Sequence, residues 1–398
     1  HINLAELRKG KFRYETDRFL SADFHIYDEF FQTHGRIRAA LNDYLVSRVI
    51  TVDQRGVLEG KTRAIFATAN FLTDLNKTEV LETGDYAIAD RFHIVYNVPE
   101  LSFNEKMDTL MGVVEGNLTS SETIKDLMKE LSDLRKSKGI SVETLEQFKA
   151  YALCNVIVPK WVYQTVLLFA ERAEFYLGEY YAPSIRKSAH LINLMRMNAA
   201  LEGRNVILPK DVELILSNTL FLDRRMMKKL ANRSHKPISD KAHIFYEAFV
   251  NVDLDDASLK DKKRNIRTMS DYVGIVLVAN DLVRVGLDGA EVVNKLKEYY
   301  GEDVLNKFRK DLVEKFMNGN KAVVLDLLQK ITNTGANAQE SPMYGFIEDV
   351  NETLKNIDLD GLFNTLANGF SISKGVKNDA DSLEEEQINR SRSWRRKL

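Results

Sequence analysis

The sequence has one cysteine, six prolines and no long apolar run. A single cysteine excludes an intrachain disulfide and argues for a reducing compartment, so we expect a cytoplasmic protein. Cys154 lies in an apolar helical stretch, which predicts a packed thiol. No stretch approaches 18 apolar residues, so no membrane span is predicted. With one cysteine and seven histidines that lack ligand spacing, the sequence gives no support to zinc, disulfide-redox or Ser-His-Asp chemistry.

An excess of charge of one sign is also absent. The chain has 56 basic and 58 acidic residues, for a net charge of −2. This balance argues against nucleic acid as the partner. The arginine-rich end around Trp394 follows the acidic run Glu384 to Glu386, which favours a solvated tail over a tail that binds single strands.

The 398 residues are enough for two or three domains, and their character changes along the chain. Strand patterns at 24–27, 63–68 and 92–98, with a helical pattern at 35–45, predict an α/β layer with a mostly parallel sheet. From about residue 102 the pattern is helical, and the scarcity of proline favours long helices. We expect helices that begin near 120, 141, 159, 184 and 209, followed by helices at 268–284, 288–299, 302–317, 320–332 and 345–367.

Two acids follow the first predicted strand directly. Asp28 and Glu29 resemble the Walker B pair of P-loop ATPases, in which the first acid holds the Mg²⁺ shell and the second polarises the attacking water. A strand that runs into a solvated turn is the simpler interpretation of these two residues taken alone.

Three further polar residues lie at positions in the sequence that suit contact with a phosphate group or its attacking water. Asn70, at the end of the second predicted strand, is placed to orient a water near a γ-phosphate, or is a turn residue. Arg91 is placed to stabilise charge on a phosphate across a subunit boundary, or is a surface arginine. Arg186 lies near the start of a helix, where the helix dipole disfavours a cation, so an anionic partner is favoured.

The order of these elements resembles the AAA+ ATPases: Asp-Glu, helix, strand with Asn, Asp-Arg-Phe and then a helical lid with Pro-x-x-Arg. The lid segments resemble the MoxR group, and the opening segment resembles its RavA-type members. The resemblance covers residues 2–218 and rests on the set of motifs rather than on any one. The segments that carry it are 4–14, 139–148, 158–162 and 200–212.

This resemblance implies a role for each candidate residue. Asp28 would be the Mg²⁺-linked acid that binds the cofactor, and Glu29 the catalytic base. Asn70 would be sensor 1, Arg91 the arginine finger and Arg186 sensor 2. The implied fold is α/β followed by all-α: part of an AAA+ core at 1–101, the AAA+ helical lid at 102–218, a helical extension at 219–375 that is a packed domain or a partner module, and a charged tail at 376–398.

The chain departs from the family pattern at three places near the acids. Ser47 precedes Arg48 where the family usually has Glu, the loop after Glu29 lacks a proline-rich turn, and His25 interrupts the strand. These departures concern the coupling to substrate more than hydrolysis.

The phosphate-binding half of such a site is missing from the sequence. No G-x-x-x-x-G-K-[ST] motif occurs. The segment Gly56 to Thr62 is one residue short and precedes a strand instead of following one, so we interpret it as a hairpin-like loop with its lysine in solvent. We expect the P-loop unit to lie outside this chain, before His1 or on another chain, and the remaining half-sheet to expose apolar surface.

The resemblance implies an ATPase that uses ATP and Mg²⁺, forms a ring of copies of itself (we expect a hexamer) and remodels or chaperones a partner protein. MoxR-type ATPases are often paired with proteins that carry a von Willebrand factor A domain, so such a partner is implied. The alternative is a non-hydrolysing AAA+ remnant that acts as an interaction scaffold.

Overall fold

The computed structural model describes fourteen stretches of the chain. They are residues 17–30, 41–42, 44–52, 56–69, 90–96, 102–114, 125–126, 129–130, 132–133, 139–178, 182–220, 241–251, 256–332 and 339–372. None of the helices in these stretches is long and apolar enough to cross a bilayer.

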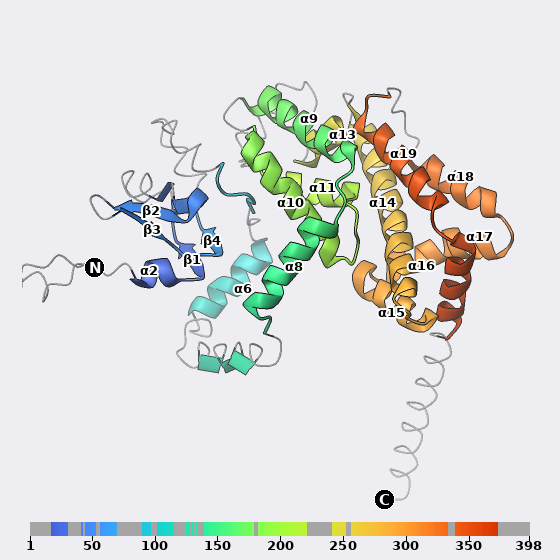
Figure 1. Ribbon diagram of the computed structural model, residues 1–398, viewed down its shortest axis with the longest axis horizontal. Helices are drawn as coiled ribbons and strands as arrows, with labels where there is room; N and C mark the ends of the chain where they lie inside the picture. Colours follow the sequence, from blue (N-terminus) through green and yellow to red (C-terminus); the bar gives the residue numbers. More distant parts are fainter. Residues whose placement is uncertain are drawn as a thin grey trace, which may run out of the picture.

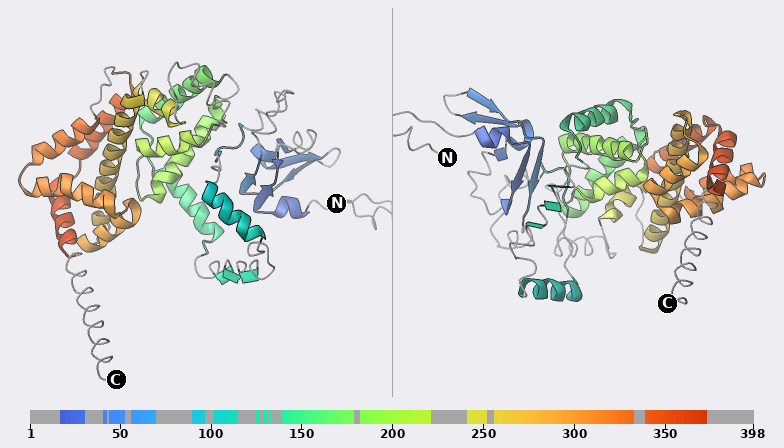
Figure 2. Two further views of the ribbon diagram at one scale, coloured as in Figure 1. Left: turned by 180° about the vertical axis from the view of Figure 1, so that it is seen from behind. Right: turned by 90° about the horizontal axis from the view of Figure 1, so that it is seen from below.

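The strands lie at one end of the molecule and the C-terminal helices at the other, with the helices of the middle segment between them (Figures 1 and 2). The strand end contains α2 (Asp17–Ser21), β1 (Phe24–Tyr27), β2 (Val49–Val52), β3 (Gly56–Glu59) and β4 (Ala64–Ala67). The middle contains α6 (Phe103–Val114), α8 (Val142–Asn155), α9 (Lys160–Leu177), α10 (Ile185–Leu201) and α11 (Pro209–Ser217). The far end contains α13 (Ala242–Val250), α14 (Asp256–Arg284), α15 (Gly289–Tyr300), α16 (Glu302–Phe308), a π-helical turn (Arg309–Val313), α17 (Glu314–Met317), α18 (Lys321–Thr332), α19 (Pro342–Lys355) and a helix at 359–372.

Strands β1 and β4 pair in parallel, with Phe24 opposite Ala64 and Tyr27 opposite Ala67. The predicted first and second strands are therefore confirmed, as is their parallel pairing. Because the two strands point the same way, the residues that follow each of them meet at one edge of the sheet.

One face of this pair is packed and contains His25. Its ring nitrogens lie 2.9 Å from the carbonyl oxygen of Phe19 and 3.0 Å from the hydroxyl of Tyr27. Its ring also lies against Phe19 and Tyr44. The unexpected histidine is thus a hydrogen-bonded core residue, and it fixes α2 against β1.

The opposite face of the pair is apolar and exposed. Phe24, Ile26 and Phe66 retain 56%, 76% and 58% of their surface. Parallel sheets are ordinarily covered on both faces. The expectation that the half-sheet exposes apolar surface is therefore confirmed.

The segment that imitates a P-loop is part of a hairpin. Strands β2 and β3 pair antiparallel, with Val49 opposite Glu59 and Val52 opposite Gly56, and Lys61 is exposed in the loop that leads to β4. The hairpin-like interpretation is confirmed, although the two short strands themselves were not predicted. The β-branched run Val49 to Val52 was the signal for them.

The third predicted strand is wrong over residues 92–96, which form irregular chain with a bend at His93. The amide of Val95 donates to the carbonyl of Asn218 at 2.5 Å, beyond the end of α11. This segment therefore bonds to the helical region instead of to the edge of the sheet.

Arg48 follows the helical residues 44–47 and adopts a left-handed conformation, with φ at 60°. Its guanidinium donates to the carbonyls of Tyr44 at 3.1 Å and Thr62 at 3.2 Å, and also to that of Leu45. The side chain thus satisfies the carbonyls that a helix leaves free at its C-terminus.

The predicted helix starts near Ser141, Pro159, Ser184 and Pro209 are confirmed. Ser141 and Ser184 cap α8 and α10 by accepting from the amides three residues on. Helix α10 ends before Gly203, whose φ of 71° suits glycine. The helix predicted at 120–138 lies mostly outside the described residues.

Three details of the later helices differ from expectation. Helix α14 begins at Asp256, twelve residues before the predicted start. The single helix predicted at 345–367 is broken at Asp358, whose carboxylate accepts from the amide of Gly361 at 3.1 Å and begins a new helix. Helix α13, with all nine residues buried, was not predicted.

Cys154 is exposed on α8, so the prediction of a packed thiol is wrong. Its helix buries one residue, Ala152, and half-buries Phe148 and Leu153, whereas its other residues are exposed. The apolar residues next to Cys154 in the sequence led to the wrong prediction that its side chain is buried.

One continuous hydrophobic core runs through the middle helices and the C-terminal helices, from Val156 to Phe370. Trp161 of α9 packs edge-on against Phe249 of α13 and Phe346 of α19, at ring-centre distances of 5.6 and 5.4 Å. The predicted boundary near residue 218 stays a prediction, and the structure shows a shared core on both sides of it.

A buried carboxylate strengthens that junction. Glu213 of α11, 5% exposed, accepts from the hydroxyl of Tyr246 at 2.6 Å and from Arg267 at 2.6 and 3.1 Å. Hydrogen bonds to a charged acceptor are stronger than neutral ones, so Glu213 holds α11 to α13 and α14.

The substitution Gly60→Ala should destabilise the strand end. An added Cβ would lie 2.4 Å from the hydroxyl of Tyr44, which is fully buried and bonds to Thr62 at 2.5 Å. We expect the free energy of unfolding in urea to fall by about 1–3 kcal/mol. The neighbouring exposed variant Glu59→Ala should change it by less than about 0.5 kcal/mol. Equal stability of Gly60→Ala and the parent protein would contradict this packing.

Candidate functional site

The acidic pair lies at the carboxyl edge of the β1–β4 sheet. Asp28 and Glu29 follow β1 and are exposed, and Thr68 follows β4. The hydroxyl of Thr68 donates to the carboxylate of Asp28 and accepts from the amide of Glu29 at 3.0 Å. Parallel pairing thus brings two acids and one hydroxyl together at the end of two strands.

The turn that carries Glu29 has an uncommon backbone. Glu29 has a φ of 48°, in the left-handed region. The amide of Phe30 donates to the carbonyl of Thr68 at 2.9 Å, and the amide of Thr68 donates to the carbonyl of Tyr27 at 2.8 Å. These bonds hold a non-glycine residue in a conformation that costs about 1–3 kcal/mol, a kind of strain that concentrates at functional sites.

Asn70 lies outside the described residues. It follows Thr68 by two positions, so its predicted place near the acids stays a prediction. The hydroxyl of Thr68 was not predicted as part of this site, although Thr68 is the last residue of the strand predicted at 63–68.

Arg91 and Arg186 lie elsewhere, on the wall of a cavity of about 1500 Å³ between the strand end and the helices. Phe24 and Ala64, the first residues of β1 and β4, line this cavity, so its wall includes the amino ends of both strands. Four residues of a strand span about 13 Å, so the acids and the arginines belong to opposite edges of the sheet.

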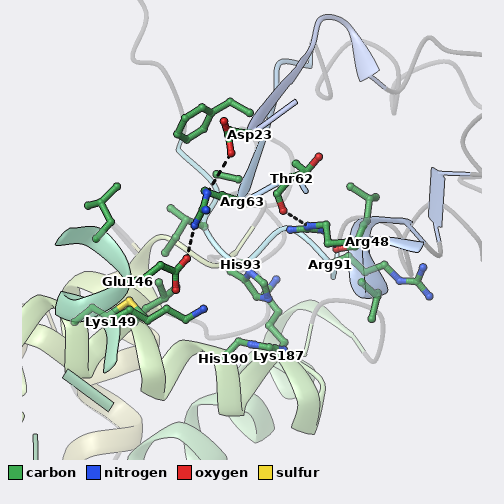
Figure 3. Close-up of a pocket in the computed structure, with 18 of the residues that line it drawn as sticks. Asp23, Arg48, Thr62, Arg63, Arg91, His93, Glu146, Lys149, Lys187 and His190 are labelled. Atoms are coloured by element: carbon green, nitrogen blue, oxygen red, sulfur yellow. Dashed lines mark hydrogen bonds and ion pairs between the residues drawn. The ribbon is translucent and has the colours of Figure 1, made fainter. Parts of the chain in front are cut away.

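The cavity wall has more basic than acidic side chains. Figure 3 shows Arg48 and Arg91 from the strand end together with His190 and Lys187 from α10, on either side of His93. The basic residues are Arg48, Lys61, Arg63, Arg91, Lys149, Arg186 and Lys187, and the acidic ones are Asp23, Asp90 and Glu146.

Some of these charges are already paired. Arg63 contacts Asp23 at 3.2 Å and Glu146 at 2.5 Å, which joins β4 to α8 (Figure 3). In the described stretches, no carboxylate pairs with Lys61, Lys149 or Arg186. The cavity therefore favours an anion over a cation.

Arg91 is half-buried and donates to the carbonyl of Asn42, in the helical stretch 41–47. Arg186 is exposed in the first turn of α10. Both guanidinium groups are thus attached to elements that face the cavity, one from the strand end and one from the lid.

Lys187 is the buried cation of this wall, with 5% exposure. Its ammonium lies 3.9 Å from the carboxylate of Asp90 and 3.5 Å from the carbonyl of Thr219. Burial lowers the pKa of Lys187 to about 8, and the nearby charge of Asp90 opposes that shift.

A pair of histidines crosses from the strand end to α10. The rings of His93 and His190 have centres 4.6 Å apart. Burial, followed by the effects of His190, Lys187 and Arg48, lowers the pKa of His93 to about 4, against a weaker opposing effect of Asp90. A neutral His93 is therefore part of the native contact. This pair and Lys187 were not predicted from the sequence, because their proximity depends on tertiary structure.

The acids fit a hydrated magnesium ion better than a protein-enclosed metal. No cluster of three or more His, Cys, Asp or Glu residues with metal-binding geometry occurs in the described stretches. Asp28 and Glu29 supply hard oxygen ligands at an exposed edge. Mg²⁺ commonly keeps several waters and uses one or two carboxylates together with phosphate oxygens.

The chain was compared with protein families, with curated sequences and with solved structures. No protein-family model matches the chain, and no curated protein matches its sequence. Among solved structures, the chain is similar to a protein from Cytophaga hutchinsonii named "putative ATPase", with 15% identity and a TM-score of 0.38. The similarity covers 62% of this chain and 70% of the other.

The histidine pair predicts a loss of stability in mild acid. The pKa of His93 lies below its usual 6.5, so the unfolded chain binds a proton between about pH 6.5 and 4 that the folded chain does not. The contribution of His93 to the free energy of unfolding should be full above pH 6.5 and should decrease as the pH falls towards 4.

Thermal unfolding of the parent protein and of His93→Asn at pH 7 and pH 5 tests this prediction. The drop in melting temperature between the two pH values should be smaller in His93→Asn. An equal drop in both proteins would contradict the assigned role of His93.

Proposed function

We propose that this chain is a subunit of a MoxR-type AAA+ ATPase that hydrolyses ATP with Mg²⁺ and uses the energy to remodel a partner protein. The observation that carries the proposal is the parallel pairing of β1 and β4. It brings Asp28, Glu29 and Thr68 to one edge, with Asn70 two residues further along the chain. Carboxyl edges of parallel strands are where α/β proteins ordinarily bind their ligands.

In this proposal each side chain at the carboxyl edge has a distinct role. Asp28 would hold the water shell of Mg²⁺, which when bound neutralises phosphate charge. Glu29 would accept a hydrogen bond from the attacking water and orient it. Thr68 already bonds to both residues and would keep the carboxylate of Asp28 in place. These are positioning and electrostatic roles, which dominate in phosphoryl transfer.

Arg91 and Arg186 would act on the ATP of a neighbouring subunit. Within one chain they line the cavity at the amino edge, whereas the acids lie at the carboxyl edge. One γ-phosphate cannot contact both groups of the same chain, so a complete site would need two copies. A closed ring, which we propose to be a hexamer, supplies such an interface at every subunit.

The exposed face of Phe24, Ile26 and Phe66 supports a further part of the proposal. We propose that another strand–helix layer, which carries the phosphate-binding loop, covers this face. The remodelled partner would be a protein with a von Willebrand factor A domain, as implied by the resemblance of the lid segments to the MoxR group.

The substitution Glu29→Gln should abolish hydrolysis and spare ATP binding. In the full-length protein we expect kcat to fall by about 10²–10⁴-fold, because the amide no longer orients the water. Single-turnover hydrolysis and equilibrium binding of labelled ATP measure the two effects. Glu59→Gln on β3 is the matched control and should hydrolyse normally. Wild-type turnover by Glu29→Gln would rule out its proposed role, and a parent protein without ATPase activity would favour the scaffold alternative.

The substitution Arg91→Ala should also abolish turnover. Arg91 lies at the amino edge of the sheet, whereas Glu29 lies at the carboxyl edge. Loss of an arginine finger lowers kcat by about 10³–10⁵-fold. ATP binding to the subunit's own site should be unchanged, since Arg91 lies at the opposite edge. Lys61→Ala, which removes another cation of the same cavity, is the control. The proposal fails if Arg91→Ala hydrolyses ATP at the parent rate.

A further inference from the structure

Asp90 connects the strand end to the lid through a single carboxylate. The hydroxyl of Ser184 donates to one of its oxygens at 2.7 Å, and the amide of Ser184 lies 3.4 Å from the other. Ser184 is the N-cap of α10 and accepts from the amide of Lys187 at 3.2 Å. Asp90 thus holds the start of a helix, where a negative charge is favourable.

The residues next to these two partners are the arginines of the cavity. Arg91 follows Asp90 directly, and Arg186 comes two residues after Ser184. Both arginines line the same cavity. A bond between Asp90 and Ser184 therefore fixes the two backbone positions from which the guanidinium groups extend.

We propose that Asp90 is a positioning residue that sets the distance between Arg91 and Arg186 by bonding to Ser184 at the start of α10. The effect on catalysis rests on the proposed function. The positioning of α10 by Asp90 does not depend on that function.

The charge of Asp90 has a second effect on the same helix turn. Lys187, the neighbour of Arg186, is buried, and its ammonium lies 3.9 Å from the carboxylate of Asp90. Asp90 raises the pKa of Lys187 against the stronger effect of burial. The groups around this pair are His93, His190 and Arg48, all of which are neutral or positive at pH 7. Loss of Asp90 would thus leave a buried cation without its counter-charge.

Three further contacts among the described residues also connect the strand end to the helices. These are the ion pair of Arg63 with Glu146, the bond from Val95 to Asn218 and the ring contact of His93 with His190. They hold the two parts together without touching the start of α10. Removal of Asp90 should therefore loosen the geometry of the arginines and leave the protein folded.

A distance measurement tests the positioning without ATP. Val57 on β3 and Ala189 near the start of α10 are exposed, so the variant Val57→Cys/Ala189→Cys, in a background in which the exposed Cys154 is replaced by Ser, provides two sites for spin labels. We expect a narrow distance distribution in this protein and a broader one after Asp90→Asn. Asp288→Asn is the matched control, since Asp288 caps α15 without contact to the strand end. An unchanged distribution in Asp90→Asn would overturn the proposal.

Activity of the full-length protein tests the catalytic consequence. Asp90→Asn should lower kcat at least tenfold with the KM for ATP unchanged, because the arginines act on the neighbour's transition state. The exchange variant Asp90→Ser/Ser184→Asp restores a hydroxyl–carboxylate pair and should recover most of kcat, whereas Ser184→Asp alone should not. A folded Asp90→Asn protein with the parent kcat overturns the proposal. A parent protein without ATPase activity would instead refute the proposed function, and the spin-label distances would still decide the positioning.

Discussion

The parallel pairing of β1 with β4 is the constraint on which the rest of the structure depends. It gives the small sheet two chemically different edges, with Asp28, Glu29 and Thr68 at the carboxyl edge and the basic cavity at the amino edge. The same pairing buries His25 on one face and leaves Phe24, Ile26 and Phe66 exposed on the other. The chain thus presents an acidic edge, a basic edge and an apolar face in one small unit.

Residues 90–96 join this unit to the helices. Asp90 bonds to Ser184, the ring of His93 lies against His190, and Val95 bonds to Asn218. These contacts link the segment to α10 and to the residues after α11, elements that belong to the large helical core. Arg91 lies within the same segment, between Asp90 and His93.

The sequence was sufficient to predict β1, β4 and the starts of helices α8 to α11, because their signals are local. Ser141, Ser184 and Pro209 mark helix starts through capping and the fixed φ of proline. The strand predicted at 92–98 was wrong over its described part because β-forming residues there bond to Asn218. Helix α13 was missed because it is buried on every side, which leaves no amphipathic pattern. The types of residue at the candidate site could be predicted from the sequence. The separation of Asp28 and Glu29 from the arginines could not, because it depends on how the elements pack.

Co-assembly of two inactive variants tests the central claim most directly. If Glu29 and Arg91 of different subunits form one site, rings assembled from equal amounts of Glu29→Gln and Arg91→Ala subunits should regain activity. About one interface in four would join an intact acidic edge to an intact arginine edge, so about a quarter of the parent rate is predicted. Mixed rings no more active than either variant alone would contradict a site shared between subunits.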